Sequence, residues 1–268
     1  LTLTACATAT FGTNVTATTI NLDGCSSATF NGNVTAGTLI NPTLTTFPIT
    51  FNGITDITGA ATFNTTGLVT FGDAAGDTLT FRNGLTHTAG PSGLSGHLIS
   101  YDTPINLTDA TPQTLTLGTD SSINTDNGTG GNIILGAISN TASHTLGLTA
   151  HGGDIEIQGV VGGGTALGAI TINSANNAWF YNNVTTSATS NINVTATTIH
   201  LDGMAFNLTA GTGLNVTLTG VIELSNGPVT VNARGNITFA GTVNGNQNLT
   251  VESTNTGAIE FTAAVGNL

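Results

Sequence analysis

Two cysteines are the residues whose spacing points most directly to a covalent bond. Cys6 and Cys25 each open the pattern Cys-x-x-Ala-Thr-Phe, in two segments that follow one another directly along the chain. If the two segments stack as neighbouring turns of one fold, the Cα atoms of the two cysteines lie about 5 Å apart, which a disulfide can span. The sequence therefore predicts a Cys6–Cys25 disulfide, which an oxidising compartment favours. A stacked pair of small buried thiols is the alternative.

One aromatic cluster could bind a ligand. Trp179, Phe180 and Tyr181 are consecutive and are bracketed by two Asn-Asn pairs. Aromatic plates with amide neighbours can stack on sugar rings, so Trp179 and Tyr181 form the predicted ligand patch. The alternative is an aromatic corner that packs on the next turn of the fold.

Two acidic segments are candidates for a hard cation. The run Gly72–Thr80 resembles the Gly-Gly-x-Gly-x-Asp-x-Leu-x repeat of calcium-binding β-rolls, but it departs at the second and fourth positions and occurs once. Asp120, Asp126 and Asn127 lie in a Gly-rich segment with oxygen ligands suited to Ca²⁺. Because β-roll sites need tandem copies, we expect no cofactor and interpret these residues as turn formers, with Ca²⁺ as the alternative.

The sequence contains few of the residue arrangements that hydrolases or lyases need for catalysis. Asp154 and Glu156 share one strand face but stand alone, whereas glycoside hydrolysis needs two carboxylates across a cleft. Arg82 and Arg234 are the only basic residues besides histidine, so a lyase has little with which to hold a uronate. Five histidines share no metal-ligand spacing; they are His87, His97, His144, His151 and His200. We expect His200 to be exposed to solvent and the protein not to be an enzyme, with a polysaccharide lyase or hydrolase as the alternative.

Sequons for N-glycosylation are frequent. Asn-x-Thr begins at Asn14, Asn33, Asn64, Asn106, Asn127, Asn183, Asn193, Asn207, Asn215, Asn236 and Asn248. These asparagines are candidate glycosylation sites if the chain is secreted. Thr-x-Thr pairs such as Thr8-x-Thr10 and Thr16-x-Thr18 raise ice binding as a further alternative, but Thr35-Ala-Gly37 already breaks such a ladder.

Composition excludes several classes. The net charge is -12 with two basic residues, so nothing neutralises nucleic-acid phosphates and we expect no nucleic-acid partner. Charged residues are 6% and apolar residues 38% of the chain, and the apolar residues alternate as disordered chains do not. Thr, Asn, Gly and Val are poor helix formers, and no apolar run is long enough to span a membrane.

An internal repeat of about 20 residues predicts the fold. Residues 14–24 read NVTATTINLDG, and residues 193–203 differ from them once, at an offset of 179 that we interpret as nine units of 20. Within each unit, apolar and polar residues alternate with period 2 and the phase shifts at a corner. We predict an all-β, right-handed parallel β-helix (a β-solenoid) with coils of about 19–22 residues, about thirteen in all. In this fold Val15 stacks over Val34 and Phe11 over Phe30. A β-sandwich is the competing fold.

The chain is predicted to be a single solenoid segment over residues 1–268. Turn residues cluster around residues 84–131, where we expect loop insertions in preference to a domain boundary. Neither end reads as a polar cap. We therefore expect the segment to continue in a longer repetitive polypeptide, with end-to-end self-association as the alternative.

Two stretches carry a family resemblance. Residues 153–176, GDIEIQGVVGGGTALGAITINSAN, and residues 235–268 resemble the repeats of filamentous-haemagglutinin-like bacterial exoproteins. The resemblance implies a β-helical shaft, an extracellular location on a cell surface, and a structural or adhesive role as an adhesin or filament component. Host or matrix glycans would then be the partners.

Overall fold

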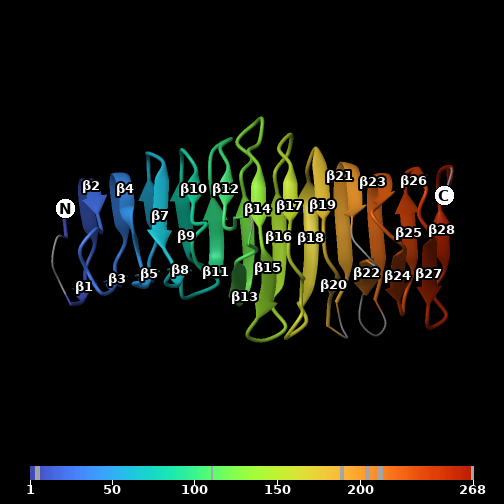
Figure 1. Cartoon of the computed structure of the whole chain (residues 1–268), viewed down its shortest axis with the longest axis horizontal. Helices are drawn as coiled ribbons and strands as arrows, with labels where there is room; N and C mark the ends of the chain where they lie inside the picture. The colour runs from blue at the N-terminus through green and yellow to red at the C-terminus, as the bar shows by residue number, and fades with distance from the viewer. Residues whose placement is uncertain (4–6, 110, 188–189, 203–205, 210–213, 267–268) are drawn as a thin grey trace.

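Alternating apolar and polar residues form short strands along the whole described chain. The structure is a computed structural model that describes residues 1–3, 7–109, 111–187, 190–202, 206–209 and 214–266; the side chains of 42, 43 and 206–209 are not described. These residues contain 28 strands and no helix, and thus no helix long and apolar enough to cross a bilayer. All strand pairings within these residues are parallel, and the coils stack along one axis from the N-terminus to the C-terminus (Figure 1). The predicted β-solenoid is confirmed, with about 11 turns.

Each coil runs along three successive faces. The first face consists of β1 (Ala9–Phe11), β3 (Ala28–Phe30), β5 (Ile49–Phe51), β8 (Val69–Phe71), β15 (Ala137–Asn140), β20 (Val184–Thr185), β22 (Phe206–Thr209), β24 (Val229–Ala233) and β27 (Leu249–Ser253). The second face consists of β6 (Thr55–Ile57), β9 (Thr78–Phe81), β16 (Thr145–Thr149), β18 (Ala169–Ser174), β25 (Ile237–Ala240) and β28 (Ile259–Phe261). The third face consists of β7 (Ala61–Thr65), β10 (Leu85–Thr86), β12 (Ile105–Asn106), β14 (Ile133–Leu135), β17 (Ile155–Ile157), β19 (Asn177–Phe180) and β26 (Val243–Gly245).

Six longer strands turn a corner between two faces. β11 (Ser92–Ile99) and β13 (Thr114–Asn124) run from the first face to the second. β2 (Val15–Asn21), β4 (Val34–Thr45), β21 (Ile192–Asp202) and β23 (Val216–Ser225) run from the second face to the third. A strand can continue through a corner because the change of phase in the sequence moves the apolar residues back to the inside.

The register confirms the predicted stacking of neighbouring coils. Val15 pairs with Val34 and Phe11 with Phe30. Eight register steps lead from Val15 to Val194, so the two copies of the repeated NVTATTI motif occupy the same position on the second face. The predictions of nine units and of about thirteen coils were therefore wrong. Coils are longer than the predicted repeat wherever a corner carries a loop.

Residues 84–131 remain within the stack. β10 to β14 pair in parallel with the coils on both sides. On the third face, Ile105 pairs with Ile133 and Ile133 pairs with Ile155, so the first of these two coils is the longer one. The additional residues form loops outside the strands, which the turn-rich sequence of this region favours.

A continuous apolar core fills the interior from Ile20 to Val243. On the first face, the rings of Phe11, Phe30 and Phe51 stack with centroids 4.8 and 5.1 Å apart, and Phe71 continues the column at 6.4 Å. Burial of such ladders contributes about 25 cal/mol per Å² of apolar surface. No single coil can bury its own inner face, so each depends on its neighbours.

Candidate functional site

A shallow groove of about 370 Å³ lies on the second face of the solenoid. Its floor is one column of outward-facing residues from four consecutive coils: His97, Ser122, Gly147 and Thr171. Strands on one face are about 4.8 Å apart, so this column extends for about 14 Å along the rod. The complete lining is His97, Asp120, Ser121, Ser122, Thr145, Leu146, Gly147, Thr171 and Asn173.

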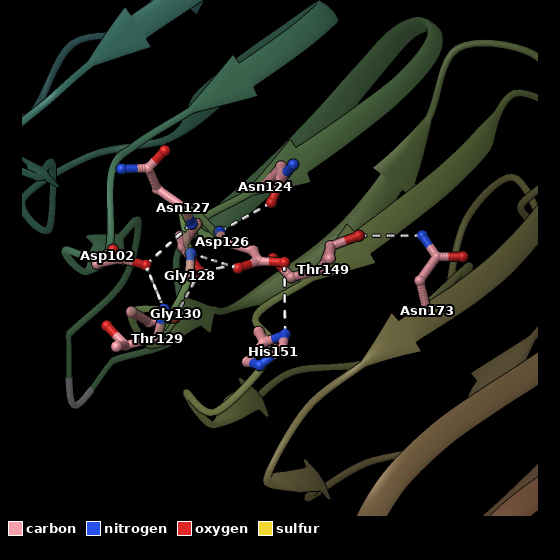
Figure 2. Close-up of polar contacts among 12 residues, drawn as sticks. Asp102, Asn124, Asp126, Asn127, Gly128, Thr129, Gly130, Thr149, His151 and Asn173 are labelled. Carbon is pink, nitrogen blue, oxygen red and sulfur yellow. Dashed lines mark hydrogen bonds and ion pairs between the residues drawn. The ribbon is translucent and has the colours of Figure 1, made fainter.

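The groove exists because Gly147 has no side chain in this column. A Cβ at Gly147 would meet only the Cβ of Ser122, at 3.7 Å, so the space above the strand is open. The register of β16 with β18 shifts after Leu148, and Thr149 pairs with Ser174. This bulge gives Asn173 an extra position, and its Nδ2 donates a hydrogen bond to Thr149 Oγ1 at 3.0 Å (Figure 2). Bulges commonly re-aim a side chain beside a site.

Hydrogen-bonding groups surround the groove. His97 Nδ1 and Ser122 Oγ are 2.8 Å apart. Asp120 accepts a hydrogen bond from the backbone N–H of Thr145 at 2.8 Å, and its side chain remains 68% exposed. His144 Nδ1 lies 3.9 Å from the same carboxylate. The groove thus offers a carboxylate acceptor, an imidazole, hydroxyls and an amide to one ligand.

A second polar cluster closes a loop at the corner between the second and third faces. Asp102 Oδ1 accepts hydrogen bonds from the backbone N–H groups of Asn127, Thr129 and Gly130, at 2.9, 2.9 and 2.7 Å (Figure 2). These bonds lower the pKa of the Asp102 carboxyl, the one from Gly130 most. Asp102 has a positive φ of 56°. Its carboxylate is committed to holding the loop that follows β13.

The calcium candidates use their oxygens in turns. Asp126 Oδ1 accepts the N–H of Gly128 at 2.9 Å, and Oδ2 lies 3.5 Å from His151 Nδ1 (Figure 2). Asp77 accepts the backbone N–H groups of Asp73 and Ala74 at 2.9 and 3.0 Å. Within the described part of the chain, no group of three or more His, Cys, Asp or Glu residues is placed to hold a metal ion. These contacts are those of turn formers, and Ca²⁺ binding stays the alternative prediction.

The predicted ligand patch lies on the third face as a stack of rings. Trp179 and Tyr181 are parallel with centroids 5.9 Å apart, and the His200 ring lies on Trp179 at 3.4 Å. His200 was predicted to be exposed to solvent, but it is half-buried, because β19 pairs with β21 and places the imidazole over the indole. Burial lowers the pKa of His200. With one indole face covered, the contacts match the alternative of aromatic packing between coils.

Carboxylates flank this ring stack. Glu156 pairs with Trp179 in the register, and Glu223 pairs with His200. Burial raises the pKa of Tyr181, and the charges of Glu156 and Asp202 add to this effect. Asp154 accepts hydrogen bonds from the backbone and side-chain amides of Asn177 at 3.0 and 2.8 Å. Asp154 therefore holds a corner of the coil.

Four of the sequon asparagines form short ladders at the corner before the second face: Asn14, Asn33, Asn215 and Asn236. Asn14 Oδ1 accepts the N–H of Asn33 one coil later, at 3.0 Å. Asn215 and Asn236 repeat this contact with the next coil, at 2.8 and 2.9 Å. The residue after each ladder asparagine faces the core, and the threonine after that faces out. The solenoid alone therefore produces Asn-x-Thr at this corner.

Glycosylation of the candidate asparagines stays a prediction. Asn14, Asn33, Asn127, Asn183, Asn236 and Asn248 are exposed, and Asn64, Asn106, Asn193 and Asn215 are half-buried. The side chain of Asn207 is not described.

The cysteine pair is described only in part. Cys25 is 8% exposed and disulfide-bonded. Its predicted partner, Cys6, lies outside the described residues, so the pairing stays a prediction. The predicted pairing requires the same 19-residue offset as the pair Ala9 and Ala28 in the adjoining strands β1 and β3.

Sequence reasoning missed the groove. His97, Ser122 and Thr171 are far apart in sequence and share no motif, and the unequal coil lengths between them conceal their common column. One local signal was present: in Leu146-Gly147-Leu148 the two leucines face inward, so the outward position of this strand has no side chain.

Comparison with known proteins identifies no relative. No protein-family model, no curated protein and no solved structure matches the chain. Membership of the filamentous-haemagglutinin-like family therefore stays a prediction, and the β-solenoid fold is the part of that resemblance with structural support.

Proposed function

We propose that this chain is a structural and adhesive segment of an extracellular rod on a bacterial surface, akin to filamentous-haemagglutinin-like exoproteins, and that it has no enzymatic role. The observation that carries the proposal is the uninterrupted apolar core through about 11 parallel coils. A solenoid of this kind grows in length with each coil added while its cross-section stays constant. The distance from its base to its tip is then set by the number of coils.

The geometry suits a spacer. With about 4.8 Å per coil, about 11 turns give a rod about 50 Å long. Parallel backbone hydrogen bonds connect each coil to the next along the axis, and stacked side chains such as Phe30 and Phe51 bridge the same interface. Both kinds of contact resist separation of the coils.

The surface and the disulfide support an extracellular setting. Threonine, asparagine and serine cover the outward positions, while charged residues are 6% of the chain. Disulfides persist in oxidising compartments and are rare in the cytosol of most organisms. The disulfide-bonded Cys25 is therefore consistent with secretion.

The proposed partners are further coils and extracellular glycans. On β28, Ile259 and Phe261 are 44% and 37% exposed, and Val265 just beyond is 43% exposed. A further coil, from the same polypeptide or from a second copy, would cover these apolar side chains and pair with the strand edge. Adhesion would then use the lateral faces, which stay open when coils are added.

Immunogold electron microscopy of the source cells tests the location. Antibodies raised against the purified chain are expected to label structures outside the cell boundary on unpermeabilised cells. An antibody against a cytoplasmic protein is the control and should label only after permeabilisation. Gold confined to the cytoplasm would overturn the proposal.

Adhesion needs a separate measurement. Beads coated with the purified chain are expected to attach to immobilised matrix or glycan surfaces more than beads coated with serum albumin. Equal attachment of both kinds of bead would leave a shaft without an adhesive role and would contradict that part of the proposal.

A further inference from the structure

We infer that the groove around Gly147 on the second face is a binding site for one neutral saccharide unit. The inference gives the adhesive part of the proposed function a ligand class, and its biological meaning rests on that function. It is carried by the shape of the groove, by the chemistry of its lining and by the charge around it.

The size of the groove fits a small ligand. Its volume of about 370 Å³ is at the lower end of the range of about 300–1,000 Å³ seen for ligand pockets. It lies in a regular column, and Ser122 and Thr171 keep their side chains on either side of the gap at Gly147. The walls belong to four paired strands, so the site is built on the rigid part of the coil and not on loops.

The lining offers polar groups at opposite sides of the gap. On one side, His97 and Ser122 hold each other at 2.8 Å, and the exposed carboxylate of Asp120 has acceptor capacity beyond its bond to Thr145. On the other side, the bulge places the exposed amide of Asn173. A carboxylate and an amide on opposite sides can bind hydroxyls at different positions of one sugar ring, since the carboxylate accepts and the amide both donates and accepts.

The charge selects against acidic ligands. Asp120 lies in the lining, and the chain carries a net charge of -12 with only Arg82 and Arg234 as permanent cations. Neither arginine lines the groove. A uronate or another anionic sugar would face the Asp120 carboxylate with no permanent cation in the lining, so a neutral sugar is the ligand that the groove favours.

Two glycine substitutions make a matched test. Gly147→Val would fill the groove, and its new Cβ meets only an ordinary contact at 3.7 Å. Gly93→Val introduces the same side chain at an outward position of the first face, where the nearest contact is 3.6 Å. Both are strand positions that a β-branched residue suits, so both variants should keep the fold. Circular dichroism and the unfolding midpoint check this before binding is measured.

Binding is measured by saturation-transfer-difference NMR with glucose, galactose, mannose and N-acetylglucosamine. Each sugar is used at about 20–50 mM, a range suited to dissociation constants on the order of millimolar. At least one neutral sugar is expected to give a signal with the wild-type chain and with Gly93→Val. Gly147→Val and Asp120→Ala should lower that signal about tenfold, and glucuronate should give none.

Three results would overturn the inference. They are the absence of a signal from every neutral sugar with the wild-type chain, an undiminished signal with folded Gly147→Val, and an equal loss with Gly93→Val. Surface labelling of cells is independent of these measurements. A chain that labels at the surface but binds no sugar would refute the saccharide site and leave the rod intact.

Discussion

Replacing Phe51 with alanine is expected to cause a large but local loss of stability. Phe51 is fully buried, and it lies in the first-face column between Phe30 and Phe71. Its ring is parallel to that of Phe30 within 3°, and Phe63 meets it edge-on with centroids 6.0 Å apart. The substitution therefore removes the centre of an aromatic cluster without changing a surface position.

The magnitude follows from burial and stacking. A fully buried Phe→Ala change costs about 3–5 kcal/mol, and each aromatic pair adds about 0.5–1.5 kcal/mol beyond its buried area. Because Phe51 has close aromatic partners on both sides, we expect about 4–5 kcal/mol. Phe51→Leu should cost only about 1–1.5 kcal/mol, since Leu94 and Leu117 already occupy the same column further along the rod.

Hydrogen exchange of the native protein measures both the size and the reach of the effect. Coils interact only with their neighbours, so protection should fall in β3, β5 and β8 and stay unchanged in β23 and β25. Phe261→Ala is the control, because Phe261 is 37% exposed and, among the described rings, stacks only on Phe239. It should cost no more than about 1–2 kcal/mol, confined to the last coils.

Two results would refute this reasoning. A cost below about 1 kcal/mol for Phe51→Ala would mean that the ring column does not stabilise the stack as burial predicts. An equal loss of protection in β3 and in β25 would mean that the rod unfolds as one unit, contrary to nearest-neighbour coupling.

Three further predictions concern a histidine, a loop and the cysteines. Burial lowers the pKa of His87 in the folded protein. The stability that neutral His87 contributes is therefore complete above the unfolded-state pKa of about 6.5 and is lost as pH falls below it. The urea midpoint should be lower at pH 5 than at pH 7. Asp102→Ala removes the acceptor of three backbone N–H groups; faster hydrogen exchange and faster proteolysis are expected at residues 127–130. Mass measurement after alkylation without reductant should find no free thiol, because Cys25 is disulfide-bonded and Cys6 is its predicted partner.

Each of these predictions has its own control. The neutral His87 imidazole donates through Nε2 to the Thr65 carbonyl and accepts at Nδ1 from the Ser92 hydroxyl. Glutamine does not titrate, so the urea midpoint of His87→Gln should fall less between pH 7 and pH 5 than that of the wild-type protein. If the urea midpoint of His87→Gln depended on pH as strongly as that of the wild-type protein, His87 would not be the group that causes the loss of stability. For the loop, Asp109→Ala changes a carboxylate outside residues 126–130 and should leave their exchange unaltered. Alkylation of both thiols without reductant would exclude the disulfide.

The alternation of residues settled the main features of the fold. Apolar and polar residues with period 2 specify which side chains enter the core, because successive residues of a strand point to opposite faces. The close repeat at residues 6–36 also predicted the stacking of Val15 on Val34 and of Phe11 on Phe30. These pairs could be read from the sequence because no insertion separates the two coils.

Tertiary structure alone decided which outward side chains meet. Val15 pairs with Val34 but Leu98 pairs with Ile123, so the step along the chain to the next coil is longer at the second position. The sum of such steps depends on loops that have no periodicity. The sequence therefore fails to indicate that His200 covers Trp179 or that Gly147 opens a gap in its column. Burial restricts most inner positions to apolar residues, whereas outward positions accept most polar residues. The core could therefore be predicted from the sequence, whereas the surface sites could be identified only once the register of the coils was known.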